Sequence, residues 1–527
     1  MYKLLRLILV AAVGCLVAGF YGYCAEESAG TIDKQEQDLR KDAEMNERLT
    51  NEKTKVTAPE VIEPFTAKPL EGEQAVLIKK IEVTGAGLFD AAQVETVTAK
   101  YVNKELTLKQ MQAVCDEITA LYRAKGYLTS RAYLAPQTIK EGVLSITIIE
   151  GKIGDVVIKG NKYFKDVLIK KDINVKPGKI FDYETLQENV DRLNRYLDRV
   201  VKAVLVPGKV PGTTDIVFQV VDKFPVHIGF DYDNYGSRLI GGSRFAAILE
   251  HNNLTGNDDR LSYKYQLSQA RYYWLHSLAY ALPISSNWNL NFYYLKSFSR
   301  LGKEYKSADI TGKSDLAGVS VSYEIFNKAK TALSAKTGFD YKRVNNFTAG
   351  TLTSRDNDRV VNVGLDLDFT DKLGRNIVSA QGDSGIPNVL NGAATKVPLA
   401  TRLGAGGKFW KATVDYYRLQ PMFLSSSLLL KGQYQFSPYK LLSIEQFQLG
   451  GVSSVRAYPA AEYSGDKGYF LGAEWSFPFY GLSKTLKVPF SKSTIYDAAR
   501  WVLFYDTGTT GVKGAPPGEG KRANANG

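Results

Sequence analysis

The stretch VNVGLDLDF, residues 361–369, alternates apolar and polar side chains at every position. Because successive side chains of a β-strand point to opposite faces, this pattern predicts a strand with one apolar and one polar face. The same alternation occurs in VHIGFDYD (226–233), RLSYKYQL (260–267) and NWNLNFYY (287–294). These segments predict an antiparallel sheet of one-sided strands.

The alternating pattern continues from residue 223 to the end of the chain, residue 527, without helical periodicity. A soluble β-sandwich would also alternate, but these strands are about ten residues long and their apolar faces are rich in aromatic residues, as in a transmembrane β-barrel. We therefore predict an antiparallel transmembrane β-barrel over 223–527. About 13 strands are recognisable through RWVLFYDTG (500–508), and bacterial barrels have even strand numbers. The odd count predicts an incomplete barrel that lacks a C-terminal piece.

The N-terminus has the layout of a secretory signal peptide. Lys3 and Arg6 precede an apolar run that ends near Tyr23, and charged residues begin at Glu26. The run is short for a spanning helix, which needs about 20 apolar residues, so we predict a cleaved signal peptide over 1–25 rather than a signal anchor.

A charged, helix-permissive segment follows, which is compatible with a solvated helix or with disorder, and we assign residues 26–75 to this charged segment and a linker. Pro59, Pro64 and Pro69 predict a linker because proline fixes φ and lacks a hydrogen-bond donor. Cys15 and Cys24 fall in the leader, so Cys115 is the cysteine expected in the mature chain. Its helical stripe with Met111 and Ile118 predicts a buried, inert thiol.

Two copies of one α+β module lie between the linker and the barrel. Residues 76–151 and 152–222 each show the order β-α-α-β-β. In the first copy, Gly126 falls where a helix end needs a left-handed residue, which predicts a C-terminal cap.

The composition argues against several function classes. Lys and Arg exceed Asp and Glu by 67 to 55, but the charges are dispersed, so we expect no nucleic-acid partner. His227, His251 and His276 have no metal-ligand spacing and no persuasive Ser or Asp partner, so we expect no metal, cofactor or enzymatic activity, an outer-membrane hydrolase included. The sequence has no P-loop motif of the form G-x-x-x-x-G-K-[ST], so we do not expect ATP to drive the activity.

Four sequence features together resemble the two-partner secretion transporters of the haemolysin secretion/activation family. They are the junction LYRAKGYLTSRAYLAPQTIKEGVLSITIIEGKIGDVVIKGN (121–161), the hairpin DNYGSRLIGGSRFAAILEHNNLTGNDD (233–259), the loop tetrad Val455, Arg456, Ala457 and Tyr458, and the F-x-D-x-G residues Phe504, Asp506 and Gly508. The resemblance implies two periplasmic POTRA domains and a 16-stranded barrel in the Gram-negative outer membrane. The family's barrel continues about three strands beyond F-x-D-x-G. Its members often have an N-terminal plug helix, and the resemblance implies that residues 33–56 would be its counterpart.

The same resemblance implies an inward-folded loop that carries Arg456. Trp501, Leu503 and Tyr505 share one face of their strand and suit lipid, so Asp506 is expected on the lumen face, where it would latch Arg456. Ala457 replaces the family's usual glycine, and it would be strained if the position required positive φ.

The implied function is secretion of an unfolded haemolysin- or adhesin-type exoprotein that carries a two-partner secretion domain. Outer-membrane lipids are the other expected partners, and a monomeric barrel is expected. A barrel-assembly factor and a passive porin are the alternatives. The two modules with the transporter-type junction favour secretion.

Overall fold

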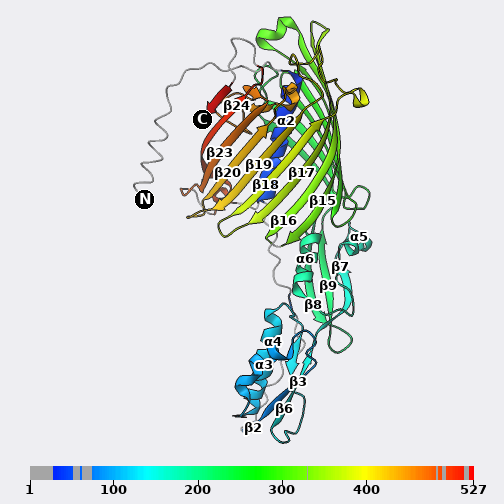
Figure 1. Ribbon diagram of the computed structural model, residues 1–527, viewed down its shortest axis with the longest axis vertical. Coiled ribbons are helices and arrows are strands. Elements are labelled where there is room, and N and C mark those ends of the chain that lie inside the picture. Colours follow the sequence, from blue (N-terminus) through cyan, green and yellow to red (C-terminus); the bar gives the residue numbers. More distant parts are fainter. Residues whose placement is uncertain are drawn as a thin grey trace. The chain divides into compact units, whose positions relative to one another are not determined.

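The computed structural model describes residues 28–50, 60–61, 74–328, 330–481, 485–488, 494–514 and 522–527. The predicted signal peptide and the linker prolines lie outside these residues. The chain forms two compact units (Figure 1). One comprises Glu52–Val226 and His251–Asp259, and the other comprises Met1–Asn51, His227–Glu250 and Arg260–Gly527.

The first module has the predicted order β-α-α-β-β. Its elements are β3 (Lys80–Thr84), α3 (Ala91–Thr98), α4 (Leu108–Ala124), β5 (Arg131–Tyr133) and β6 (Val143–Ile149). The sheet order is β3-β6-β5, with β3 parallel and β5 antiparallel to β6. A short pair, β2 (Val76–Ile78) with β4 (Lys104–Leu106), was not predicted.

Helix α4 forms the core of this module. Thr107 caps its start by accepting a hydrogen bond from the Gln110 amide, and Gly126 follows its end with φ of 92°. Met111, Cys115 and Ile118 are buried on one face against the sheet. The apolar stripe in the sequence therefore corresponds to the packed face of the helix.

The second module repeats this arrangement. It contains β7 (Lys152–Lys159), α5 (Asp166–Lys171), α6 (Tyr183–Leu193), β8 (Arg199–Pro207) and β9 (Thr213–Asp222). β7 runs parallel to β9, and β8 runs antiparallel to it. An additional strand, β1 (Glu60–Val61), pairs in parallel with β8 inside the segment predicted as linker.

Beyond the second module, the described residues form a large sheet of 14 strands in sequence order. The strands are β10 (Val226–Asp233), β11 (Arg244–His251), β12 (Arg260–Ser268), β13 (Tyr273–Pro283), β14 (Trp288–Arg300), β15 (Ile310–Lys328), β16 (Thr331–Thr348), β17 (Thr351–Thr370), β18 (Arg375–Gly385), β19 (Trp410–Pro421), β20 (Ser427–Phe436), β23 (Lys467–Pro478), β24 (Arg500–Gly511) and β25 (Arg522–Asn526). Thirteen of the described strands run from β10 to β24 inclusive, as predicted, and β25 adds an unpredicted fourteenth.

Three strands are much longer than predicted: β15, β16 and β17 have 19, 18 and 20 residues. The first part of β17, residues 351–358, reads TLTSRDND and is polar at every position except Leu352. The pattern 361–369 marks only the part of the strand with one apolar face, because a segment whose two faces are both polar shows no apolar–polar alternation.

Helix α2 (Ala29–Thr50) lies within the curve of this sheet (Figure 1). It contacts β14, β15, β16, β18 and β19, and we call the face of the sheet toward α2 the inner face. The helix contains residues 33–50 of the segment that the resemblance assigns to a plug, and residues 51–56 lie outside the described chain. Aromatic side chains such as Phe230, Phe292 and Trp501 are exposed on the sheet. In the described residues, no helix has the length and apolar character needed to span a membrane.

Candidate functional site

The connection between β20 and β23, residues 437–466, folds against the inner face of the sheet. It contains the turn η4 (Ser443–Glu445) and a small hairpin of β21 (Phe447–Leu449) with β22 (Tyr463–Gly465). Leu449 and Val455 are buried with Phe470 of β23. Gly450 and Gly451 have φ of 109° and 91°, so these two positions favour glycine. We call residues 437–466 the inward loop.

Arg456 at the tip of the inward loop binds Asp506 of β24. Its Nε and Nη2 atoms donate to the two carboxylate oxygens of Asp506 at 2.7 Å each, and its backbone N–H donates at 3.2 Å. Asp506 is fully buried. The structure therefore brings together the two residues that the sequence pairs, in the bidentate geometry that strengthens a charge-assisted hydrogen bond.

A second carboxylate, Glu474 of β23, was not predicted. The Nη1 atom of Arg456 donates to Glu474 Oε1 at 2.9 Å, while the guanidinium carbon lies 3.8 Å from the centroid of the Phe504 ring. The alternation of KGYFLGAEWSFP (467–478) places Glu474 on the same face as Phe470 and Gly472, so parity alone would have shown that it points inward.

The other predicted motif residues also lie at this site. Tyr458 stacks edge-on against Tyr463 with ring centroids 5.6 Å apart. Gly508 allows close packing, because a Cβ there would lie 2.8 Å from Leu449 Cδ2. Ala457 is not among the positive-φ residues of the described chain, so the strain anticipated for an alanine at this position is absent. Positive φ occurs instead at Ala461, with 52°.

Near the start of the inward loop, Glu445 binds two lysines on the inner face of the sheet. Its carboxylate contacts Lys342 Nζ of β16 at 2.6 Å and Lys411 Nζ of β19 at 2.7 Å, and Glu445 is fully buried. The neighbouring Ile444 packs in a cluster with Ala29 and Ile32 of α2. These contacts were not predicted, because no local sequence pattern relates Glu445 to positions that are 103 and 34 residues away.

Asp466 fastens the two ends of the inward loop where they meet. It accepts hydrogen bonds from both Nη atoms of Arg402, at 2.5 and 3.2 Å. It also accepts from the backbone N–H groups of Leu441 at 2.8 Å and Lys513 at 2.7 Å. A buried carboxylate with this many donors is well satisfied.

Charged residues of α2 bind the inner face along the helix. Lys41 pairs with Asp415 of β19 at 2.5 Å, and Asp42 pairs with Lys431 of β20 at 3.1 Å. Nearer the start of the helix, Glu36 pairs with Arg244 of β11. The helix is therefore held by polar contacts to several strands rather than by apolar packing alone.

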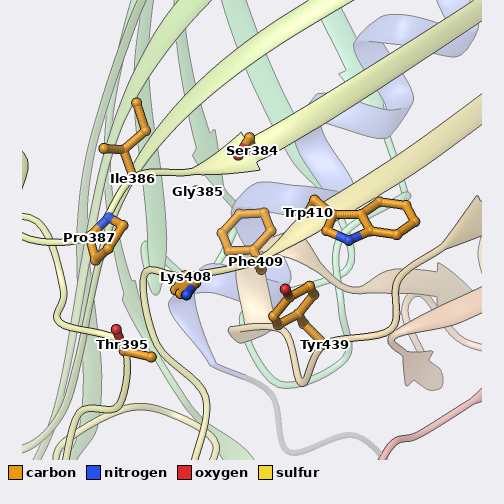
Figure 2. Close-up of a pocket in the computed structure, with 9 residues that line it drawn as sticks. All are labelled: Ser384, Gly385, Ile386, Pro387, Thr395, Lys408, Phe409, Trp410 and Tyr439. Atoms are coloured by element: carbon orange, nitrogen blue, oxygen red, sulfur yellow. The ribbon is translucent and has the colours of Figure 1, made fainter.

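A cavity of about 360 Å³ lies where β18 ends and β19 begins (Figure 2). Its lining is Ser384, Gly385, Ile386, Pro387, Thr395, Lys408, Phe409, Trp410 and Tyr439. Among the described residues that line it, Lys408 carries the one charge, and none is a carboxylate or a histidine. Three potential metal ligands of the His, Cys, Asp or Glu type do not cluster anywhere in the described parts of the chain.

The model of the haemolysin secretion/activation proteins of the ShlB/FhaC/HecB type matches residues 212–510. The chain belongs to this family. A ShlB-type POTRA model matches residues 76–151 of the transporter, and a POTRA model described as a surface antigen variable number repeat matches 151–222. The chain is thus an outer-membrane transporter of the two-partner secretion type, with periplasmic POTRA modules followed by a barrel.

Curated relatives of the transporter carry transport names. The outer membrane transporter CdiB of Dickeya dadantii is 25% identical over 485 residues, covering 87% of this chain and 84% of the relative. The heme/hemopexin transporter protein HuxB of Haemophilus influenzae is 24% identical and covers 81% and 76%, respectively. The hemolysin transporter protein ShlB of Serratia marcescens is 22% identical, with coverage of 78% and 73%.

The solved structure of CdiB from Escherichia coli has the same fold as this transporter. The TM-score is 0.70 at 22% identity, and the match covers 96% of this chain and 92% of that chain. CdiB from Acinetobacter baumannii matches with a TM-score of 0.58 at 17% identity. The large sheet of the transporter therefore corresponds to the wall of a β-barrel, with α2 and the inward loop on its lumen side.

Proposed function

We propose that this transporter secretes an unfolded exoprotein of the haemolysin or adhesin type, which the POTRA modules capture through its two-partner secretion domain. The exoprotein passes through the barrel without ATP, and its folding outside the cell drives transport. The observation that carries the proposal is the Arg456–Asp506 pair, because it holds a long loop on the lumen face of the barrel, in the path of a translocating chain.

In this proposal the pair acts as a latch. Two charge-assisted hydrogen bonds to one buried carboxylate favour the inward position of the loop. Removing one partner of a buried ion pair costs about 3–5 kcal/mol, since the other charge is left without a partner. The latch therefore has to open for transport, and it also has to close again to keep the pore occupied between cargo molecules. We propose that α2 is the second occupant and acts as a plug.

Cargo capture by the modules would use their sheet edges. An extended segment can add to a free edge strand through main-chain hydrogen bonds, which tolerate many sequences. In the described chain, β3 and β5 are the edges of the first module's sheet and β7 is an edge of the second, whereas β8 is already paired with β1. We propose that the exoprotein binds at one of the edges β3, β5 and β7.

The test is a secretion assay with an exoprotein that carries a two-partner secretion domain, expressed together with the transporter. Asp506→Ala, with Arg456 retained, is expected to abolish most of the release into the medium while the barrel still inserts in the outer membrane. Asp309→Asn is the matched control, because Asp309 forms a half-exposed pair with Arg300 at 3.4 Å and is not at the latch. Normal release from a correctly inserted Asp506→Ala variant would refute the latch.

Two other functions are separable by experiment. A barrel-assembly factor would alter the insertion of other outer-membrane proteins when it is removed, and a passive porin would support solute uptake with α2 and the loop in place. The two modules and the occupied lumen favour secretion over both. We further propose that the barrel is a monomer surrounded by outer-membrane lipid, which its mass in detergent can test.

A further inference from the structure

A row of alternating charges runs along the inner face of the barrel wall and connects α2 to the latch. Asp42 of α2 contacts Lys431 of β20 at 3.1 Å, and Lys431 lies 3.7 Å from Oε1 of Glu474 on β23. The same Oε1 atom accepts the 2.9 Å hydrogen bond from Arg456 of the inward loop. The order of the row is Asp42, Lys431, Glu474, Arg456 and Asp506.

Lys431 and Glu474 belong to the wall, whereas the partner on either side of them belongs to α2 (Asp42) or to the inward loop (Arg456), the two parts that move in the proposed function. Asp506, at the end of the row, lies on β24 of the wall. Lys431 and Glu474 extend from neighbouring strands, since β20 pairs with β23. Their side chains are only 10% and 21% exposed, so their charges are weakly screened. The present distance of 3.7 Å between them is longer than either outer contact, because each charge is shared with a second partner.

We propose that Lys431 and Glu474 form a relay that makes the seating of α2 and the inward position of the loop depend on each other. When α2 leaves, Lys431 loses Asp42 and closes on Glu474, which then binds Arg456 less well. When the loop leaves, Glu474 loses Arg456 and closes on Lys431, which then binds Asp42 less well. The wall pair is thus satisfied when both movable parts are present or when both are gone.

The relay favours concerted opening of the lumen. A coupling of this kind is reciprocal: the factor by which the seated helix strengthens the latch equals the factor by which the latch strengthens the seated helix. Lys431 and Glu474 act as positioning residues, because they contact the helix and the loop and need not touch the cargo. The inference rests on the proposed function of α2 as a plug and of Arg456 as a latch.

The test measures how often α2 leaves its seat, without any cargo. Met45 of α2 is buried against Ile377 and Tyr417, so a Met45→Cys reporter is protected while the helix is seated. The reporter is introduced in a chain whose three native cysteines are replaced by alanine, and its maleimide labelling rate is measured in isolated outer membranes. Heat-modified gel mobility verifies that each variant is folded.

We expect Arg456→Gln to raise the labelling rate at least about fivefold, the lower end of common allosteric couplings. In a Lys431→Met chain, α2 already leaves its seat more often, so the labelling rate is higher before the second substitution. Arg456→Gln is then expected to raise this rate further by less than about twofold. Asp415→Asn is the matched control, since it removes the Lys41 contact of the same helix but leaves the relay intact. In that background the full increase due to Arg456→Gln should persist.

Equal increases with and without Lys431 would overturn the relay, as would no increase in the parent chain. The labelling rates test the relay alone. The proposed function is tested separately, by cargo release from the Asp506→Ala variant. Normal secretion with that variant would refute the latch, whatever the labelling rates show. Loss of secretion together with unchanged labelling would refute only the relay.

Discussion

Gly472 of β23 lies directly opposite Asp506 of β24 in the barrel wall. A Cβ at Gly472 would be 3.0 Å from Asp506 Oδ1 and 2.8 Å from Phe470 Cζ. The glycine therefore provides the space in which the carboxylate can face Arg456. This role comes from its lack of a side chain and not from its backbone conformation.

Gly472→Ala is expected to weaken the latch. The added methyl group forces Asp506 or Phe470 to shift, and overpacking of this kind costs about 1–3 kcal/mol. Cargo release should fall, and the urea midpoint of the barrel in detergent should decrease. Gly382→Ala on β18 is the control, because no atom lies within 4 Å of the position of its new Cβ. Equal behaviour of the two variants would contradict the steric explanation.

Asp506 and Glu474 should contribute unequally to the latch. Asp506 receives three of the four hydrogen bonds of Arg456, and it is fully buried. Asp506→Asn is therefore expected to reduce secretion more than Glu474→Gln, by a margin of about tenfold, which corresponds to about 1.4 kcal/mol. Secretion assays at matched transporter levels check this order, and the reverse order would show that Glu474 is the main partner.

Removal of the buried charge of Glu445 should destabilise the inward loop. Glu445→Gln removes the carboxylate that Lys342 and Lys411 share and leaves Lys411 only its longer pair with Asp383 at 3.9 Å, at a cost of about 3–5 kcal/mol. Protease cleavage of the loop in isolated membranes should become faster.

The lysines provide the check on this explanation. Lys342→Met with Lys411→Met in the Glu445→Gln chain should restore part of the protection, because the two lysine charges that Glu445 neutralised are removed, while Asp383 keeps its hydrogen bond from Gln381 Nε2 at 2.7 Å. Glu304→Gln, which affects an exposed pair with Arg238, should leave cleavage unchanged. Failure of the triple variant to recover would mean that the shape of Glu445, rather than its charge, supports the loop.

Cys115 should be unreactive until its module unfolds. Burial raises the pKa of the Cys115 thiol to about 12, so only about one thiol in ten thousand is ionised at pH 8. Because the folded pKa exceeds the ordinary value of 9.0, ionisation favours unfolding only above about pH 9, and stability near pH 7 is unaffected. Alkylation should follow the urea unfolding curve, whereas a Ser145→Cys variant at an exposed strand position in a Cys115→Ala chain should react in native buffer.

Side-chain parity made much of the site predictable. In RWVLFYDTG it separates Asp506 from Trp501 and Tyr505, and the structure buries the aspartate while both aromatic residues are exposed. Val502 and Phe504, on the same strand face as Asp506, are nevertheless exposed as well. The reason is that β25 pairs with β24 only over Thr507–Gly511, so the other half of β24 has one neighbour in the described chain.

The parts of the site that sequence reasoning missed are contacts between distant segments. Nothing near Glu445 indicates that Lys342 and Lys411 approach it, because these three residues meet only after the sheet curves and the loop turns inward. The parallel pairing of β1 with β8 was missed for a related reason, since two residues are too few to give a periodic pattern. Local patterns define strands and faces, and the three-dimensional arrangement defines the partners.

The four donors that converge on Asp466 have a consequence for protein engineering. The Leu441 N–H closes residues 441–466 into a ring, and Arg402, which also donates to the Leu441 carbonyl, and Lys513 hold its base from outside the ring. The entropy cost of lengthening a closed loop grows only slowly with its length. A short reporter peptide inserted beside Ser453 would therefore enlarge the ring without shifting the register of β20 against β23. Such a peptide would report when the inward loop leaves the lumen.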